Sequence, residues 1–271
     1  MAITSLDGII AGVKPPQFFT KSGSNNTVTG KPYSFWGIAG VPGAGSYDTT
    51  LAGIALSSTS GLVNGQIPYY NAAAGKQMYL ARAVGLSSAS GIMFICDRLW
   101  HSGGLTITST GLQTVNSATW PARDNNGTIN GEGILIGVES STTLGAATPT
   151  FTMTYTNSAG TGSRTATNQT PTSSAATAGN FFMMALQAGD IGVKSIQSFQ
   201  MSASYVSGTI NLVAYRVLAV LEQPVSNLGV SADPVTGGMV KLYDGTVPFI
   251  IQLPGSVANV RISGQLIYTE G

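Results

Sequence analysis

The sequence predicts a mainly β protein with an antiparallel β-sandwich or jelly-roll-like body, an N-terminal arm that contains a short helix, and a β-rich C-terminal extension. From about residue 77 onward, short apolar or alternating runs are separated by turns rich in Gly, Asn and Ser. Short strands at such regular spacing are typical of sandwiches and jelly rolls. No long amphipathic helical pattern occurs beyond the arm, which favours an all-β body.

The strand pattern is clearest between residues 150 and 155. Phe151, Met153 and Tyr155 alternate with threonines, so apolar side chains share one face and hydroxyls the other. Threonine is β-branched and suits an extended backbone. We expect further strands at residues 78–84, 92–100, 105–110, 134–138, 181–186, 193–203, 209–221, 239–253 and 258–268.

The run at residues 209–221 is apolar on both faces of the expected strand. One face carries Ile210, Leu212 and Ala214, and the other carries Val213, Tyr215 and Val217. A strand that is apolar on both faces lies in a covered sheet or at an interface.

Residues 1–22 form the predicted arm. Apolar side chains recur at three- and four-residue spacing up to Val13, with Thr4 or Ser5 as a helix cap and Pro15-Pro16 as the end of the helix. The arm is either a segment that docks on a partner or a terminus folded onto its own domain. The docking interpretation names as interface residues Ile3, Leu6, Ile9, Ile10, Val13, Pro15, Pro16, Phe18, Phe19 and Trp36.

Three further segments complete the predicted organisation. Residues 23–76 are rich in Gly and Pro, with aromatic residues that we expect to pin an irregular segment to a surface. Residues 77–222 are the predicted sandwich body. Residues 223–271 are either an extension that adds strands to a neighbour or a small subdomain.

Charge is scarce in this chain. Only 8% of the residues are charged, against about 25% in a typical soluble domain, and 12 basic and 11 acidic residues leave a formal charge of +1. Either the surface is polar and uncharged, or partner subunits cover much of it. The basic residues are spread singly, which argues against nucleic-acid binding.

We expect no membrane segment and no signal peptide. No apolar run reaches the roughly 18 residues of a membrane span, and the first residues lack a basic stretch followed by an apolar one. A single cysteine, Cys96, excludes an intrachain disulfide.

No motif for catalysis, cofactor binding or metal binding is found. The single histidine, His101, is near Asp97 and Ser102, but no Gly-x-Ser-x-Gly elbow surrounds any serine. One cysteine and one histidine do not make a typical zinc site. We therefore expect a protein that is not an enzyme and has no cofactor or metal.

The three tryptophans, Trp36, Trp100 and Trp120, have two interpretations. Such rings stack on sugars in carbohydrate-binding proteins, so a glycan-binding adhesin is possible. Anchoring in a core or an interface is the favoured interpretation, because aromatic rings bury a large apolar area.

Several stretches resemble virion structural proteins of tailed bacteriophages, in particular head decoration (capsid cement) proteins. These stretches lie within residues 1–222 and are Lys14–Lys21, Ile92–His101, Val115–Arg123, Tyr155–Thr161 and Leu212–Leu218. The resemblance implies a β protein on the outside of a phage capsid, in the virion after assembly in the host cytoplasm. It further implies that the partners are the major capsid protein and copies of the chain itself, often as a trimer. A tail or baseplate subunit remains the alternative.

Overall fold

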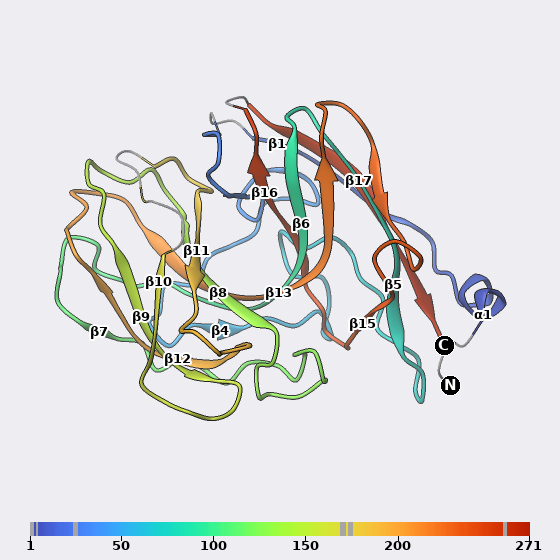
Figure 1. Ribbon diagram of the computed structural model, residues 1–271, viewed down its shortest axis with the longest axis horizontal. Coiled ribbons are helices and arrows are strands. Elements are labelled where there is room, and N and C mark those ends of the chain that lie inside the picture. The colour runs from blue at the N-terminus through green and yellow to red at the C-terminus, as the bar shows by residue number, and fades with distance from the viewer. Residues whose placement is uncertain (1–2, 4, 24–26, 169–171, 173–175, 257–258) are drawn as a thin grey trace.

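The computed structural model describes the chain except for residues 1–2, 4, 24–26, 169–171, 173–175 and 257–258 (Figure 1). Among the described residues the regular secondary structure is nearly all strand, and every strand pair in the two sheets is antiparallel. One part of the larger sheet curls into a half-barrel, and the whole is consistent with a β-sandwich. The predicted fold class is confirmed.

The smaller sheet has six strands. Its order is β14 (Val230–Ala232), β5 (Met78–Ser87), β17 (Arg261–Glu270), β1 (Gln17–Ser22) and β3 (Gly40–Val41), with β15 (Val240–Leu242) also paired to β5. The short helix α1 (Leu6–Ala11) precedes β1 and protrudes at one end of the molecule, beside the C-terminus (Figure 1).

The larger sheet has eleven strands. Its order is β2 (Tyr33–Ser34), β16 (Pro248–Pro254), β6 (Gly91–Ser102), β13 (Ile210–Gln223), β8 (Ile134–Ser140), β11 (Phe181–Ala185), β10 (Arg164–Asn168), β9 (Phe151–Asn157), β12 (Val193–Met201) and β7 (Gln113–Thr114), with β4 (Ile54–Ala55) paired to β6.

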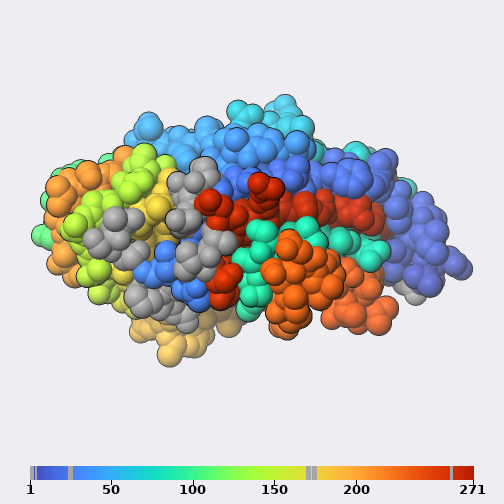
Figure 2. Space-filling view, turned by 90° about the horizontal axis from the view of Figure 1, so that it is seen from above, coloured from blue at the N-terminus to red at the C-terminus, as the bar shows by residue number. Residues whose placement is uncertain are grey.

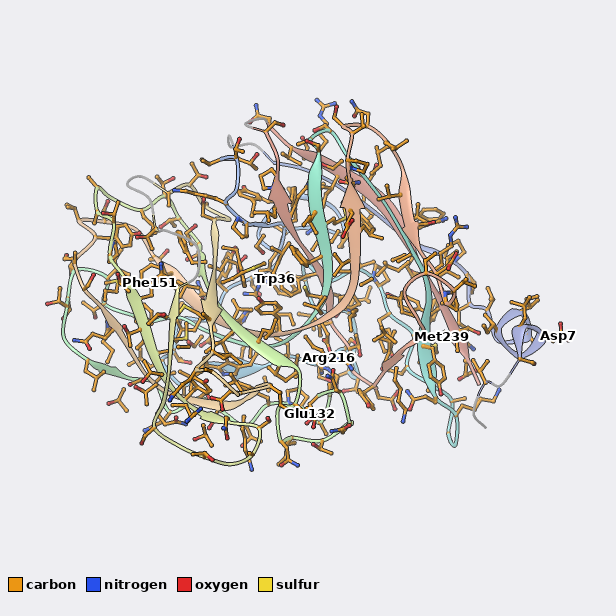
Figure 3. The ribbon with its side chains drawn as sticks, viewed as in Figure 1. Asp7, Trp36, Glu132, Phe151, Arg216 and Met239 are labelled. Atoms are coloured by element: carbon orange, nitrogen blue, oxygen red, sulfur yellow. The ribbon has the colours of Figure 1, made fainter. Side chains whose placement is uncertain are left out.

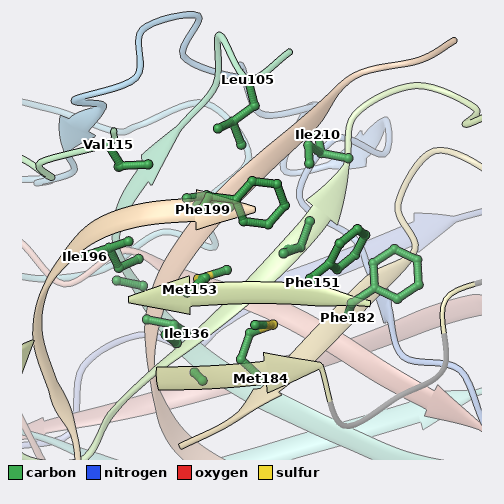
Figure 4. Close-up of a cluster of buried hydrophobic side chains, with 14 of the residues drawn as sticks. Leu105, Val115, Ile136, Phe151, Met153, Phe182, Met184, Ile196, Phe199 and Ile210 are labelled. Atoms are coloured by element: carbon green, nitrogen blue, oxygen red, sulfur yellow. The ribbon is translucent and has the colours of Figure 1, made fainter. Parts of the chain in front are cut away.

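Three apolar cores hold these sheets together. One lies within the curled part, where Phe151, Met153 and Phe199 point toward one another (Figure 4). A second joins the two sheets, with Leu266 from one and Ile250 from the other. A third surrounds Trp36 in the middle of the molecule (Figure 3).

The long strand β13 confirms the prediction of a strand apolar on both faces. Leu212 and Ala214 belong to the core of the curled part, while Val213 and Tyr215 belong to the core around Trp36. Beyond a shift in register, Leu218 and Leu221 enter the core between the sheets. Both faces of β13 are therefore covered by the chain itself from Ile210 to Leu218, whereas Val220 is 44% exposed.

The predicted strands need correction at several places. Residues 17–22, predicted as part of the arm, form strand β1 inside the smaller sheet, and the short strands β2, β3, β4, β7 and β14 were not predicted. Residues 105–110 form a loop, because the side chain of Gln113 hydrogen-bonds to the backbone of Thr106. Its amide oxygen accepts from the N–H of Thr106, and its amide nitrogen donates to the carbonyl of Thr106. The predicted strand 239–253 is divided by a turn into β15 and β16. Strand β10 was not predicted, because Arg164–Asn168 contributes only one apolar side chain, Ala166.

The C-terminal residues complete both sheets. Strand β16 lies between β2 and β6, and β17 lies between β1 and β5. In the segment before β5, the aromatic side chains of Tyr33, Phe35 and Trp36 are all buried. These rings pin the irregular segment to the body, as the sequence predicts.

Candidate docking surface

Helix α1 is held against the end of β17 by its backbone rather than by burial of its side chains. Ser5 is the N-cap, and its hydroxyl accepts a hydrogen bond from the N–H of Gly8 at 3.2 Å. The hydroxyl of Thr269 donates to the carbonyl of Ile9 at 2.7 Å, and the N–H of Glu270 donates to the carbonyl of Gly12 at 3.0 Å. The alternative cap, Thr4, lies outside the described residues.

The helix ends at Gly12, before the two prolines that were predicted to end it. Its end is set by pairing with β17: Val13 bridges Thr269, and the N–H of Lys14 donates to the carbonyl of Tyr268 at 2.9 Å. The ammonium of Lys14 also lies 2.8 Å from the carboxylate of Glu270. The chain is thus extended and fixed in direction before it reaches Pro15.

Apolar side chains on α1 and just beyond its end are exposed. Leu6, Ile10 and Val13 are 70%, 63% and 49% exposed. Leu6 and Ile10 are four residues apart and share one face of α1, whereas Val13 lies two residues beyond the helix, where it bridges Thr269. No residue of α1 is buried, although Ile3 and Ile9 are partly covered on the side that faces the body. We call Leu6, Ile10 and Val13 the arm stripe.

A second apolar surface lies on the outer face of the smaller sheet. It is an open groove of ≈ 580 Å³. Six side chains line it from four chain segments: Phe18, Thr20, Val41, Val84, Ser263 and Gln265. Phe18 is 62% exposed and Val41 55% exposed, and none of the six carries a charge. We call these six residues the sheet groove.

The structure separates the predicted interface residues into two groups. Pro15 and Pro16 are exposed just after the arm stripe, and Phe18 is exposed in the sheet groove. Phe19 and Trp36 are 2% and 0% exposed, so both belong to the chain's own cores and are corrected to core residues. Phe18 and Phe19 differ because neighbouring residues of a strand point to opposite faces.

A buried charged cluster, which the sequence did not reveal, includes residues of β6 and β8, the two strands that flank β13. Adjacent residues of β6 are each paired with an opposite charge. Asp97 binds Arg123 through two hydrogen bonds of 2.9 and 3.1 Å, and Arg98 lies 2.7 Å from Glu139. These four side chains are at most 1% exposed. Because burying an unpaired charge is costly, each charge has its counter-charge.

Aromatic rings and His101 complete the surroundings of Arg98. Its guanidinium carbon lies 4.6 Å from the centroid of the Trp36 ring. Its Nε donates to Nδ1 of His101 at 3.1 Å. Burial, reinforced by the charge of Arg98, lowers the pKa of His101 from 6.5 to about 2. His101 is therefore neutral in the folded chain.

The grouping of Asp97, His101 and Ser102 does not form a catalytic triad. The two carboxylate oxygens of Asp97 accept from Arg123, and one also accepts from the N–H of Val247 at 2.8 Å. Nδ1 of His101, which an orienting carboxylate would contact, instead accepts from Arg98.

The carboxylate of Asp124, in the loop before β8, is surrounded by hydrogen-bond donors. The Asp124 carboxylate accepts hydrogen bonds from Thr128 and from the backbone of Asn126 and Gly131. Although burial opposes the effect, these bonds lower the pKa of Asp124. The described residues contain no group of three or more His, Cys, Asp or Glu side chains that could hold a metal ion.

The tryptophan rings are core anchors. Trp36, Trp100 and Trp120 are 0%, 0% and 3% exposed, so none presents a face on which a sugar could stack. The glycan-binding interpretation loses the rings on which it was based. Within the described part of the chain, no helix has the length and apolar character needed to cross a membrane.

Fold and surface together define an antiparallel β-sandwich that exposes two apolar surfaces, the arm stripe and the sheet groove. No protein-family profile matches the chain, and no curated protein matches it. Among solved structures, the infectious bursal disease virus VP2 subviral particle aligns with a TM-score of 0.19 and 8% identity over 99% of this chain and 82% of that chain. The Gx strain of the same virus aligns with a TM-score of 0.18 and 11% identity over 94% and 81%. Similarities this weak carry no argument about this chain.

Proposed function

We propose that this chain is a non-enzymatic virion structural protein that binds the outside of a bacteriophage capsid and reinforces it. The observation that carries the proposal is the arm stripe. Large apolar side chains gathered on a surface mark a site of protein contact. In a chain with 8% charged residues, such a surface favours a role in assembly.

The sequence resemblance to head decoration proteins supplies the partner in this proposal. A contact through a two-turn helix is small, and small interfaces are weak individually. On a symmetric shell, contacts of one oligomer with several sites add avidity, so a weak arm is sufficient there. The same reasoning favours a shell over a single binding site.

The test replaces apolar side chains of the arm stripe by polar ones and leaves the strands intact. Deletion of all 22 residues of the arm would remove strand β1 from the smaller sheet, so Leu6→Ser together with Ile10→Ser is the better variant. Leu112→Ser is the matched control, because Leu112 is 64% exposed and lies in a loop beside β7.

We expect particles assembled with the double variant to carry several-fold less of the chain than particles assembled with the control. Equal occupancy of the two variants would contradict a role for the stripe in attachment. Labelling the chain in intact particles tests the location separately. A label on the tail and none on the head would favour the tail or baseplate alternative.

A further inference from the structure

We infer that the sheet groove receives the arm stripe of a second copy of this chain, so that copies associate head to tail. The inference does not depend on a capsid, because both surfaces belong to this chain. It rests on four observations: both surfaces are apolar and uncovered, their sizes agree, their charges are complementary, and the arm does not reach its own groove.

The arm is held away from its own groove by the hydrogen bonds that fix it. Residues 12–14 bind the backbone of Tyr268, Thr269 and Glu270, whereas the groove lies at Ser263 to Gln265 of the same strand. Five residues of strand, from 269 to 264, correspond to roughly 17 Å. Figure 1 shows α1 beyond the end of β17, and Figure 2 shows the N-terminal residues gathered at that end of the molecule.

The dimensions of the two surfaces agree. Helix α1, which carries Leu6 and Ile10 of the arm stripe, has six residues and is roughly 9 Å long. The groove lies between two exposed arginines, Arg82 and Arg261. Arg82 pairs with Ile267, so six residues of β17, or roughly 20 Å, separate the positions of the two arginines along the strand. A two-turn helix fits between them.

The charges of the two surfaces are complementary. Asp7 is the only charged residue of α1, and it is exposed at the far end of the molecule (Figure 3). Arg82 and Arg261 point to the same face as the groove, because each lies two residues along a strand from a lining residue, Val84 or Ser263. Asp7 would meet an arginine at one end of the groove, whichever way the helix lies.

The geometry is the helix-in-groove mode of recognition, with Leu6 and Ile10 at i and i+4 as the anchors on α1 and Val13 just beyond the helix. Arm and groove are different patches, so the contact is heterologous and gives a closed ring or an open chain. A ring would give each copy a filled groove and a covered arm.

Cross-linking between two variants that each carry one introduced cysteine tests the inference directly. Ile10→Cys is placed in one chain and Gln265→Cys in another, and the two are mixed under mild oxidation. The native Cys96 is buried, and burial raises the pKa of its thiol, so it does not compete. Val235→Cys replaces Gln265→Cys in the control mixture, because Val235 is 93% exposed and lies outside the groove.

We expect a mixed disulfide between the Ile10→Cys and Gln265→Cys chains, in several-fold excess over the mixture with Val235→Cys. Equal yields in the two mixtures would overturn the inference. Predominant Ile10→Cys homodimers would also overturn it, because they would show that arms pair with arms. The second measurement compares sedimentation of the unmodified chain with that of two variants, Asp7→Arg and Leu6→Ser. We expect both variants to associate more weakly than the unmodified chain. Unchanged association in both variants would refute the inference.

Discussion

The guanidinium of Arg98 lies 2.7 Å from the carboxylate of Glu139, and neither side chain is exposed. The two residues come from neighbouring parts of one sheet, because β6 and β8 both pair with β13. The phenol of Tyr47 also donates to Glu139, at 3.3 Å. Loss of one partner would leave the other charge buried without compensation.

We predict that Glu139→Gln lowers the free energy of unfolding by about 3–5 kcal/mol, the usual cost of breaking a buried ion pair. The double variant Arg98→Met, Glu139→Leu removes both charges and should lose less than the sum of the two single variants. Urea denaturation measures each value. Lys76→Ala is the control, because Lys76 is 52% exposed, lies 3.8 Å from Glu270 and should change stability by less than about 0.5 kcal/mol. An additive double variant would contradict the coupling.

Acid should destabilise the chain through His101. Its pKa is about 2 in the folded chain and 6.5 as a reference for the unfolded chain, so only the unfolded chain gains a proton between these values. Stability is therefore fully present above pH 6.5 and is lost as the pH falls, by about 1.4 kcal/mol per pH unit for one proton.

The variant His101→Asn isolates this effect. An asparagine oxygen replaces Nδ1 as the acceptor for Arg98 and does not titrate. We expect the loss of stability between pH 7 and pH 4.5 to be smaller in the variant than in the unmodified chain, as measured by urea denaturation at both pH values. All other ionisable groups are common to the two proteins, so their contributions cancel. The same loss in both proteins would show that His101 does not determine the acid sensitivity.

A second pH effect is expected at Lys21, which is 4% exposed and donates to the carbonyl of Phe35 at 2.9 Å. Burial lowers its pKa from 10.5 to about 8, although the charge of Glu139 opposes the shift. Between pH 8 and 10.5 the unfolded chain holds more protons, so stability rises with pH, by about 3 kcal/mol in total.

Lys21→Met keeps the length of the side chain and removes the titration. The difference in unfolding free energy between the unmodified chain and this variant should change in favour of the unmodified chain as the pH rises from 8 to 10.5. Tyrosines that titrate at high pH are common to both proteins and cancel. A difference independent of pH would contradict a lowered pKa for Lys21.

Periodicity in the sequence was sufficient to predict those elements whose structure depends mainly on their own residues. Phe151, Met153 and Tyr155 alternate as a strand requires, and Ser5 caps α1 as predicted. The charged cluster could not be predicted, because Asp97 of β6 and Arg123 of the loop before β8 are 26 residues apart and meet only in the folded chain. The burial of Phe19 could have been inferred, since strand alternation allows only one of Phe18 and Phe19 to face outward. The burial of Trp36 could not, because it follows the two-residue strand β2 and depends on Arg98 and Phe249 from distant strands.

The close packing of β1 against β17 gives the last prediction. Gly264 pairs with Phe19 on one side and with Gly85 on the other. A Cβ added at Gly264 would lie 2.6 Å from the ring of Phe19 and would also meet the carbonyl oxygen of Val84. The first contact is with a buried ring and the second with backbone, so neither neighbour moves easily. We therefore predict that Gly264→Ala lowers the free energy of unfolding by about 1–3 kcal/mol.

Gly229→Ala is the matched control for this prediction. A Cβ at Gly229 meets nothing within 4 Å, so this change should be neutral or stabilise the chain by up to about 1 kcal/mol by restricting the unfolded state. Thermal and urea denaturation of the two variants make the comparison. Equal stability of the two would mean that β1 moves away from β17 at little cost. Such freedom would also widen the sheet groove, since Phe18 and Thr20 line it from β1. A large difference would instead show that the groove is a rigid surface, formed before any partner arrives.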